Sequence, residues 1–428
     1  MFKFIFAIAL IGSGFFQMFF RDPVWGIYLF AALTHIRLTQ LSENIPFPIQ
    51  IPIVIASLTG VLYLINGKYK TKFSKWPAEV WLFGCMVLGM SVSSIGAVYR
   101  PDLSWNFTLL FLKFTIFFLI FINMIDSQVK VEWFHRVMIL SAAWLVYRCW
   151  DLRGTMGPRF ENIGGDVISD ANHFAAALIL LFPFVYLKTL SRNNWVVAGA
   201  AVLCFGMIMS VFITGSRGGL LGLGALAVLL TVGFKEQRKK IITVFFVIGL
   251  SAIMFTNEYQ KGRLIDLFTG ISENTWDSSA QGRIKYWKTA LQLFKEHKLA
   301  GIGMDNFQYY SGYMVEGKEP GEVGHVTHSI WFEMLSGGGM FVTVPFIIIL
   351  IRFFMNTKKT MIRLRNDGRL DEVLYVTTIR IALGAFLVCA TFLNRLIYEP
   401  IYWCIGLGVI HSYLADKPLQ TAVNAHAK

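Results

Sequence analysis

The chain has 428 residues, of which 55% are hydrophobic and 15% charged, and its mean hydropathy is +0.56. These values exclude an ordinary soluble protein, because a soluble chain of this length carries more charge and less apolar surface. Repeated apolar runs of about 17–25 residues match the bilayer core, and they do not alternate as barrel strands do. The sequence therefore predicts an all-α, polytopic integral membrane protein.

The formal net charge of +13 is compatible with nucleic-acid binding, but the basic residues are spread over short loops and form no single stripe. Loops that face the cytoplasm carry extra lysine and arginine, which accounts for the charge more simply. We therefore expect the lipid bilayer as a partner and no nucleic acid.

About twelve transmembrane helices are expected from the length of the apolar runs. We expect the first run to be retained, because no small-residue cleavage site precedes a hydrophilic domain. The first two runs are short, so whether both cross the membrane stays open. In chain order, the runs are 4–20, 24–36, 47–66, 78–97, 104–124, 131–150, 172–190, 195–214, 218–234, 240–255, 328–353, 371–393 and 396–413.

Lysine and arginine predict the orientation in a bacterial inner membrane. Three basic loops should face the cytoplasm: Lys68, Lys70, Lys72 and Lys75; then Lys235, Arg238, Lys239 and Lys240; then Lys358, Lys359, Arg363, Arg365 and Arg369. Counting runs from these loops places 97–103, 151–171, 214–217 and 256–327 on the periplasmic side.

Three regions follow from this topology. Residues 1–255 form N-terminal transmembrane helices, 256–327 a periplasmic loop subdomain, and 328–428 C-terminal transmembrane helices with a short cytoplasmic tail. A loop as long as 256–327 is uncommon unless it is functional.

Within this loop, residues 281–298 have the periodicity of an amphipathic helix, and Ser278 and Gln281 have capping-box spacing. Trp287 lies on its apolar face. Arg283 lies on the same face, where an unpaired charge is costly, so we expect an anionic partner for it.

The turn Thr214-Gly-Ser-Arg-Gly-Gly219 opens the run 218–234 with Arg217. A helix N-terminus attracts anions, Gly218 and Gly219 leave its N–H groups unobstructed, and an arginine adds a bidentate phosphate donor. Alternatively, the arginine reaches the lipid headgroups and the glycines serve close helix packing. Local chemistry favours neither interpretation.

Two other outer segments carry candidate residues. Arg159 lies in the loop 151–171, and an arginine in such a loop is ordinarily just solvated. The segment from His325 to Glu333 contains His-x-x-His but lacks a third metal ligand, so we predict no metal. A neutral His328 at a helix start suits a general base, although a structural histidine fits the sequence equally well.

No metal or cofactor site is predicted elsewhere. No Asp-x-Asp pair occurs to hold a divalent cation, and no Gly-Lys-Ser/Thr sequence indicates a P-loop. The cysteines have no paired spacing that would indicate a disulfide framework or a zinc site. They are Cys85, Cys149, Cys204, Cys389 and Cys404.

Taken together, these segments resemble the O-antigen ligase superfamily. The resemblance rests on Gly215–Gly219, on Gly282-Arg283 with Trp287 and Ala290, on Gly301–Phe307, and on His328–Glu333. The N-terminal part, with Arg21-Asp22-Pro23 and Arg37, is similar to the O-glycosylation ligases associated with exosortase systems.

The resemblance implies a GT-C-like, metal-independent, inverting glycosyltransferase. It would move a glycan from undecaprenyl diphosphate to an acceptor hydroxyl, commonly on a lipid A-core sugar, at the periplasmic face. Carried onto this chain, Arg217, Arg283 and Arg159 hold the diphosphate and His328 deprotonates or orients the hydroxyl. Supporting residues are Ser216, Gly218, Gly219, Trp287, Ser329 and Glu333.

This sequence departs from the family pattern at two positions. Ser329 replaces a frequent asparagine, although a serine can still cap the helix or hydrogen-bond. Gly337 replaces a frequent glutamate, which leaves His328 to carry any acid–base role on this helix, with Glu333 in a supporting position.

Two alternatives remain. An O-antigen or exopolysaccharide polymerase, or a protein O-oligosaccharyltransferase, would use the same donor site with another acceptor. An anionic lipid transporter would instead line a path across the membrane with its arginines. The candidate residues gather at one face, which favours an enzyme, and Lys113 and Arg148 are the exceptions.

Overall fold

The computed structural model describes residues 2–36, 51–66, 76–152, 170–255, 258, 261–262 and 278–417. Every regular element in these ranges is helical, as expected for an all-α protein. The first half contains α1 (Phe2–Phe20), α2 (Val24–His35), α3 (Ile51–Ile65), α4 (Ala78–Ile95), α5 (Pro101–Met124), α6 (Gln128–Asp151), α7 (Ala171–Tyr186), α8 (Asn194–Ile213), α9 (Arg217–Gly233) and α10 (Arg238–Phe255). The second half contains α12 (Ser278–Glu296), α13 (Phe307–Glu316), α14 (Ile330–Glu333), the π-helical turn η5 (Met334–Gly338), α15 (Gly339–Asn366), α16 (Leu370–Ala390) and α17 (Glu399–Ala415).

Six helical segments in the described residues are long and apolar enough to cross a membrane, and α9 with the start of α10 makes a seventh if that pair, bent by 113°, is one span. The expected number of about twelve is not confirmed. Helix length explains the difference: α2 has 12 residues and extends about 18 Å, whereas the bilayer core is about 30 Å thick. The predicted run 24–36 coincides closely with this helix, so its position was predicted, but the helix is too short to cross the bilayer core alone.

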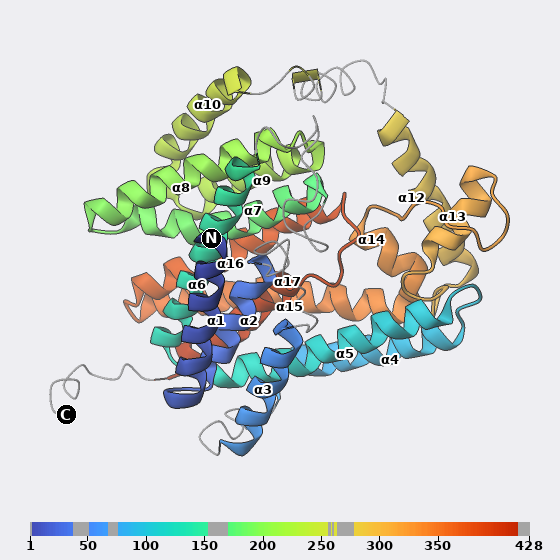
Figure 1. Ribbon diagram of the computed structural model, residues 1–428, viewed down its shortest axis with the longest axis horizontal. Helices are drawn as coiled ribbons and strands as arrows, with labels where there is room; N and C mark the ends of the chain where they lie inside the picture. Colours follow the sequence, from blue (N-terminus) through green and yellow to red (C-terminus); the bar gives the residue numbers. More distant parts are fainter. Residues whose placement is uncertain are drawn as a thin grey trace.

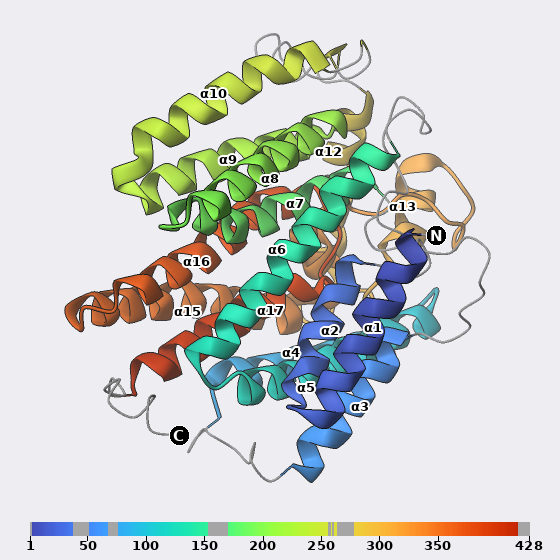
Figure 2. The same cartoon turned by 60° about the vertical axis from the view of Figure 1, so that its left-hand side comes forward.

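The helices pack around α15 and α16 (Figure 1). Helix α15 contacts α4, α16 and α17, while α16 also contacts α7 and α9. In both views, α8 to α10 lie on one side of this group and α1 to α3 on another (Figure 2). Helices α12, α13 and α14 gather at one end, on the right in Figure 1.

Side-chain caps start several of these helices. Ser127, Asp170, Asn193 and Ser216 each accept a hydrogen bond from a backbone N–H group in the first turn of α6, α7, α8 and α9, respectively. Such a cap satisfies a donor that the helix itself leaves unpaired. The sequence therefore sets these starting points locally.

Large apolar side chains cover the outside of the bundle. Trp195 is 88% exposed, Leu88 is 68% exposed and Phe246 is 66% exposed. An exposed apolar surface of this extent is unfavourable in water and suits contact with lipid. The described part of the chain thus has the surface of a multi-pass membrane protein.

The glycines of α9 allow close helix packing. A Cβ atom on Gly219 would lie 2.5 Å from the Cβ atom of Ala175 on α7, and one on Gly222 would meet the Cys389 sulfur of α16. Gly224 on the same helix has no neighbour within 4 Å of such an atom. The packing interpretation of these glycines is therefore supported at Gly219 and Gly222.

We expect Gly219→Ala to destabilise the protein by about 1–3 kcal/mol, because α7 and α9 must move apart to admit the methyl group. Thermal unfolding of the purified protein in detergent measures this change. Gly224→Ala is the matched control and should melt at the wild-type temperature or above it, since alanine favours helix. Equal melting temperatures for the two variants would refute the packing role.

Candidate active site

Two helices begin side by side at the end of the bundle that carries α12. The Ser216 hydroxyl accepts the Gly219 N–H at 2.9 Å and donates to Asn172 Oδ1 at 2.6 Å. The Asn172 N–H in turn donates to Asp170, which caps α7. This chain of hydrogen bonds joins the starts of α7 and α9 and fixes the position of Arg217, the half-buried first residue of α9.

The same geometry corrects one expectation. Because the serine cap occupies the Gly219 N–H, that group is not available to an anion. Gly219 instead permits the approach of α7. Any contribution of this turn to anion binding therefore depends on Arg217 more than on the Gly219 backbone.

The Phe392 side chain lies between Gly218, at the start of α9, and Arg283. Its Cβ atom would lie 3.2 Å from a Cβ atom on Gly218, the neighbour of Arg217. The Arg283 guanidinium carbon lies 6.0 Å from the centroid of the Phe392 ring, and the Trp287 ring lies 6.2 Å from it. A cation at this distance is attracted by the ring. The end of α16 thus brings the start of α9 and the α12 arginine together.

Trp287 links α12 to the segment that carries His328. Its ring stacks on Phe332 with centroids 5.1 Å apart, and its Nε1 group donates to the Thr327 carbonyl oxygen at 3.0 Å. Thr327 directly precedes His328. The helix that carries Arg283 therefore also positions the histidine backbone.

His328 has a backbone conformation that is uncommon for a residue with a side chain. Its φ is 50°, in the left-handed region. On either side of it, Thr327 Oγ1 donates to the Ser329 carbonyl oxygen at 3.0 Å and accepts the Ser329 N–H at 3.3 Å. Strained conformations of this kind concentrate at functional sites. The ring is half-buried just before α14, where the sequence places the candidate base.

Ser329 does not act as expected. It occupies the N-cap position of α14, but its side chain makes no cap hydrogen bond. Its buried Oγ atom has no hydrogen-bond partner within the described residues. Among the described residues, the structure thus shows neither the cap nor the side-chain hydrogen bond that the sequence allows for this serine, and Thr327 provides the local hydrogen bonds.

Two carboxyl groups lie close to this turn. Glu333 is buried, and its Oε2 atom has no hydrogen-bond partner in the described part of the chain. Asp305, which also has a left-handed φ of 60°, lines a cavity of about 10 Å³ together with Glu333, Thr327 and Asn394. Burial raises the pKa of Asp305, and the nearby Arg395 opposes that shift. A small polar cavity therefore adjoins the histidine turn.

The motif Gly301–Phe307 holds this region through its backbone. The N–H groups of Ile302 and Gly303 donate to the carbonyl oxygens of Ser336 and Gly337 at 2.9 and 3.0 Å. Gly303 has a φ of 99°, which glycine adopts without strain. The motif thus fixes the loop that presents Asp305 against the π-helical turn after Glu333.

Residues 200–347 match the family model described as O-Antigen ligase. This match supports assigning the matched part of the chain to the O-antigen ligase superfamily. Members of this family are membrane glycosyltransferase-like enzymes, namely ligases and polymerases. A search of the curated proteins finds no match. The similarity to ligases associated with exosortase systems stays a prediction.

The O-antigen ligase match includes the start of α9, α12, the Gly301–Phe307 motif and α14, where the candidate residues lie. Arg159 is outside both the matched stretch and the described residues. His325 lies within the match, but its Nδ1 atom is 2.8 Å from the Glu316 carboxylate. Although burial opposes the shift, hydrogen bonds from His325 and Lys318 lower the pKa of Glu316 to about 2. The first histidine of the His-x-x-His sequence therefore makes a structural contact with Glu316.

Sequence reasoning missed one cation of this candidate site, Arg395. It lies between α16 and α17, where residues 391–398 are not helical. Its charge acts on His173, Asp305 and Glu333. The available signal was the polar pair Asn394-Arg395 between two apolar runs.

Proposed function

We propose that this protein transfers a glycan from undecaprenyl diphosphate to an acceptor hydroxyl, with inversion and without a metal ion, at the periplasmic face of a bacterial inner membrane. The acceptor is a lipid A-core sugar. One observation carries the proposal: Phe392 and Trp287 bring the two arginine-bearing elements next to the turn that holds His328. The family match supports an enzyme of this general type.

The reaction requires two kinds of assistance from these residues. The bond from the anomeric carbon of the glycan to the diphosphate oxygen breaks, and the acceptor oxygen attacks that carbon from the opposite side. Arg217 and Arg283 neutralise the charge that develops on the departing diphosphate, as fixed cations do most effectively. His328 takes the proton of the acceptor hydroxyl, which is a poor nucleophile at neutral pH.

The orientation follows from the distribution of basic residues. Lys358, Lys359, Arg363 and Arg365 lie toward the end of α15 remote from α12. Positive residues remain on the cytoplasmic side of a membrane protein. The end that carries the arginine and histidine site then faces the periplasm, where the glycan donor is presented.

Reconstitution tests the proposal. We expect wild-type protein in liposomes to join a glycan from undecaprenyl diphosphate to lipid A-core in the presence of EDTA, with inverted configuration at the new bond. Gel mobility and mass spectrometry detect the product, and NMR gives its configuration. Activity that requires added Mg²⁺ would refute the metal-free mechanism.

An acceptor panel separates the alternatives. Transfer only to a second lipid-linked glycan would identify a polymerase, and transfer only to a serine- or threonine-containing peptide would identify a protein O-oligosaccharyltransferase. Movement of the donor lipid across the bilayer without any transfer would identify a transporter. Each of these outcomes would contradict the proposed ligase activity.

A further inference from the structure

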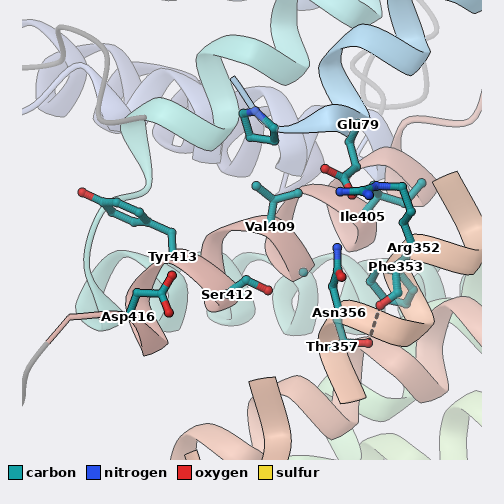
Figure 3. Close-up of a pocket in the computed structure, with 12 residues that line it drawn as sticks. Glu79, Arg352, Phe353, Asn356, Thr357, Ile405, Val409, Ser412, Tyr413 and Asp416 are labelled. Atoms are coloured by element: carbon teal, nitrogen blue, oxygen red, sulfur yellow. Dashed lines mark hydrogen bonds and ion pairs between the residues drawn. The ribbon is translucent and has the colours of Figure 1, made fainter. Parts of the chain in front are cut away.

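A second pocket lies far from the candidate active site, between α4, α15 and α17 (Figure 3). Its volume is about 250 Å³. Asn356, which lines it, is 17 residues along α15 from Gly339, or about 25 Å at 1.5 Å per residue. The pocket therefore belongs to the end of the bundle opposite α12.

An ion pair between a buried carboxylate and a half-exposed arginine forms one wall of this pocket. The Glu79 side chain is only 5% exposed, and its Oε1 atom accepts a hydrogen bond from Arg352 Nε at 3.0 Å. A buried carboxylate requires such a partner. The pair joins the start of α4 to α15 and neutralises the charge of Glu79.

The same wall offers hydrogen-bond donors that the protein does not use. Within the described residues, the two terminal nitrogens of Arg352 and the side-chain amide of Asn356 make no hydrogen bond. The two residues are four positions apart, so they share one face of α15. Figure 3 shows the Asn356 side chain directed toward the space beside the Arg352–Glu79 pair. Unused donors in this arrangement fit the oxygens of an anion such as a phosphate.

The wall formed by α17 has an apolar part and a polar part, where Asp416 is paired with Arg363, and the surroundings place the pocket at headgroup level. Ile405 and Val409 of α17 contribute hydrocarbon surface. Trp81 on α4 is 66% exposed and Lys358 follows Asn356 closely on α15. Exposed tryptophan and basic residues mark the boundary between hydrocarbon and headgroups. A lipid that enters the pocket from this boundary carries a phosphate group next to a hydrocarbon chain.

We propose that this pocket binds the phosphodiester headgroup of a glycerophospholipid from the cytoplasmic leaflet. The phosphate oxygens accept hydrogen bonds from Arg352 and Asn356, and the glycerol and first methylene groups contact Ile405 and Val409. The bound lipid stabilises the packing of α4 against α15. At their other ends, these helices are joined where Ser93 Oγ donates to the Gly337 carbonyl oxygen at 2.5 Å.

Thermal unfolding in mixed micelles tests this site. After delipidation in detergent, we expect phosphatidylglycerol and phosphatidylethanolamine to raise the melting temperature of the full-length protein. Diacylglycerol with the same chains lacks the phosphate, and glycerol phosphate lacks the chains, so neither should raise it. An equal effect of diacylglycerol, or of glycerol phosphate or inorganic phosphate alone, would overturn the proposal. A difference between the two phospholipids shows which headgroup substituent the pocket prefers.

Two variants probe the donors directly. Asn356→Leu keeps the ion pair, and the double variant Glu79→Gln, Arg352→Gln removes both charges without leaving one unpaired. Each should weaken the lipid effect by about tenfold or more in apparent affinity. Asn366→Leu, at the exposed end of the same helix, is the matched control and should keep the full effect. If Asn356→Leu binds phospholipid as the wild type does by native mass spectrometry, the assignment is wrong.

Discussion

Replacing His328 by asparagine should reduce the rate of glycan transfer by about 10²–10⁴-fold, because the acceptor hydroxyl loses its base. The protein should remain folded, since asparagine tolerates the left-handed φ of 50° better than most residues. The loss should appear in kcat measured with reconstituted protein at saturating donor and acceptor. The KM for the donor should change little, because the arginines remain.

Two further variants separate chemistry from stability. His328→Ala should lose the same activity but melt at a lower temperature, because alanine in this conformation costs about 1–2 kcal/mol. His325→Asn changes a histidine three residues earlier that contacts Glu316, and it should retain most of the activity. Near wild-type transfer by the asparagine variant of His328 would exclude this residue as the base.

Arg217→Ala and Arg283→Ala should each lower kcat/KM for the donor by about 10²–10³-fold. This is the usual effect of removing one preorganised group that stabilises transition-state charge. Steady-state kinetics at varied donor concentration measure the loss. Arg365→Ala, an exposed arginine at the basic end, is the control and should behave as the wild type does.

The double variant examines whether both arginines act on one group. If they neutralise the same diphosphate, the combined loss should be smaller than the product of the two single losses. Arg283→Lys should recover only part of the activity, since lysine keeps the charge but not the bidentate geometry. Strictly multiplicative losses, or losses confined to the KM for the acceptor, would argue against a shared diphosphate site.

Local sequence patterns predicted the local structure of this site well. Helix α9 begins at Arg217, next to the expected start of the run 218–234, and α12 occupies most of the segment in which an amphipathic helix is expected. Caps and helical periodicity depend on residues a few positions apart, so one sequence is sufficient to find them. The same patterns do not establish the number of spans, because a run such as 24–36 is located correctly but forms a helix too short to cross the bilayer core alone.

Contacts between residues that are far apart in the sequence could not be predicted from local patterns. Phe392 is more than 100 positions from both Arg283 and Gly218, yet it touches the helices of both. Arg395 joins the site only because α16 ends at Ala390 and the chain leaves the helix there. Neither residue belongs to a periodic or spaced motif, so only the packing of α16 against α9, and the place of the chain that follows α16, identify them.

Main-chain hydrogen bonds hold the region beside the histidine turn. The N–H groups of Ile302 and Gly303 donate to carbonyl oxygens of the π-helical turn. Such bonds do not depend on which side chain is present at Ile302 or Ser336. Substitution there, or at Asn394 in the neighbouring cavity, can therefore reshape the surroundings of an acceptor while the backbone frame persists. In the proposed reaction, the side chains around the acceptor can therefore change without a change in the backbone that holds the histidine turn.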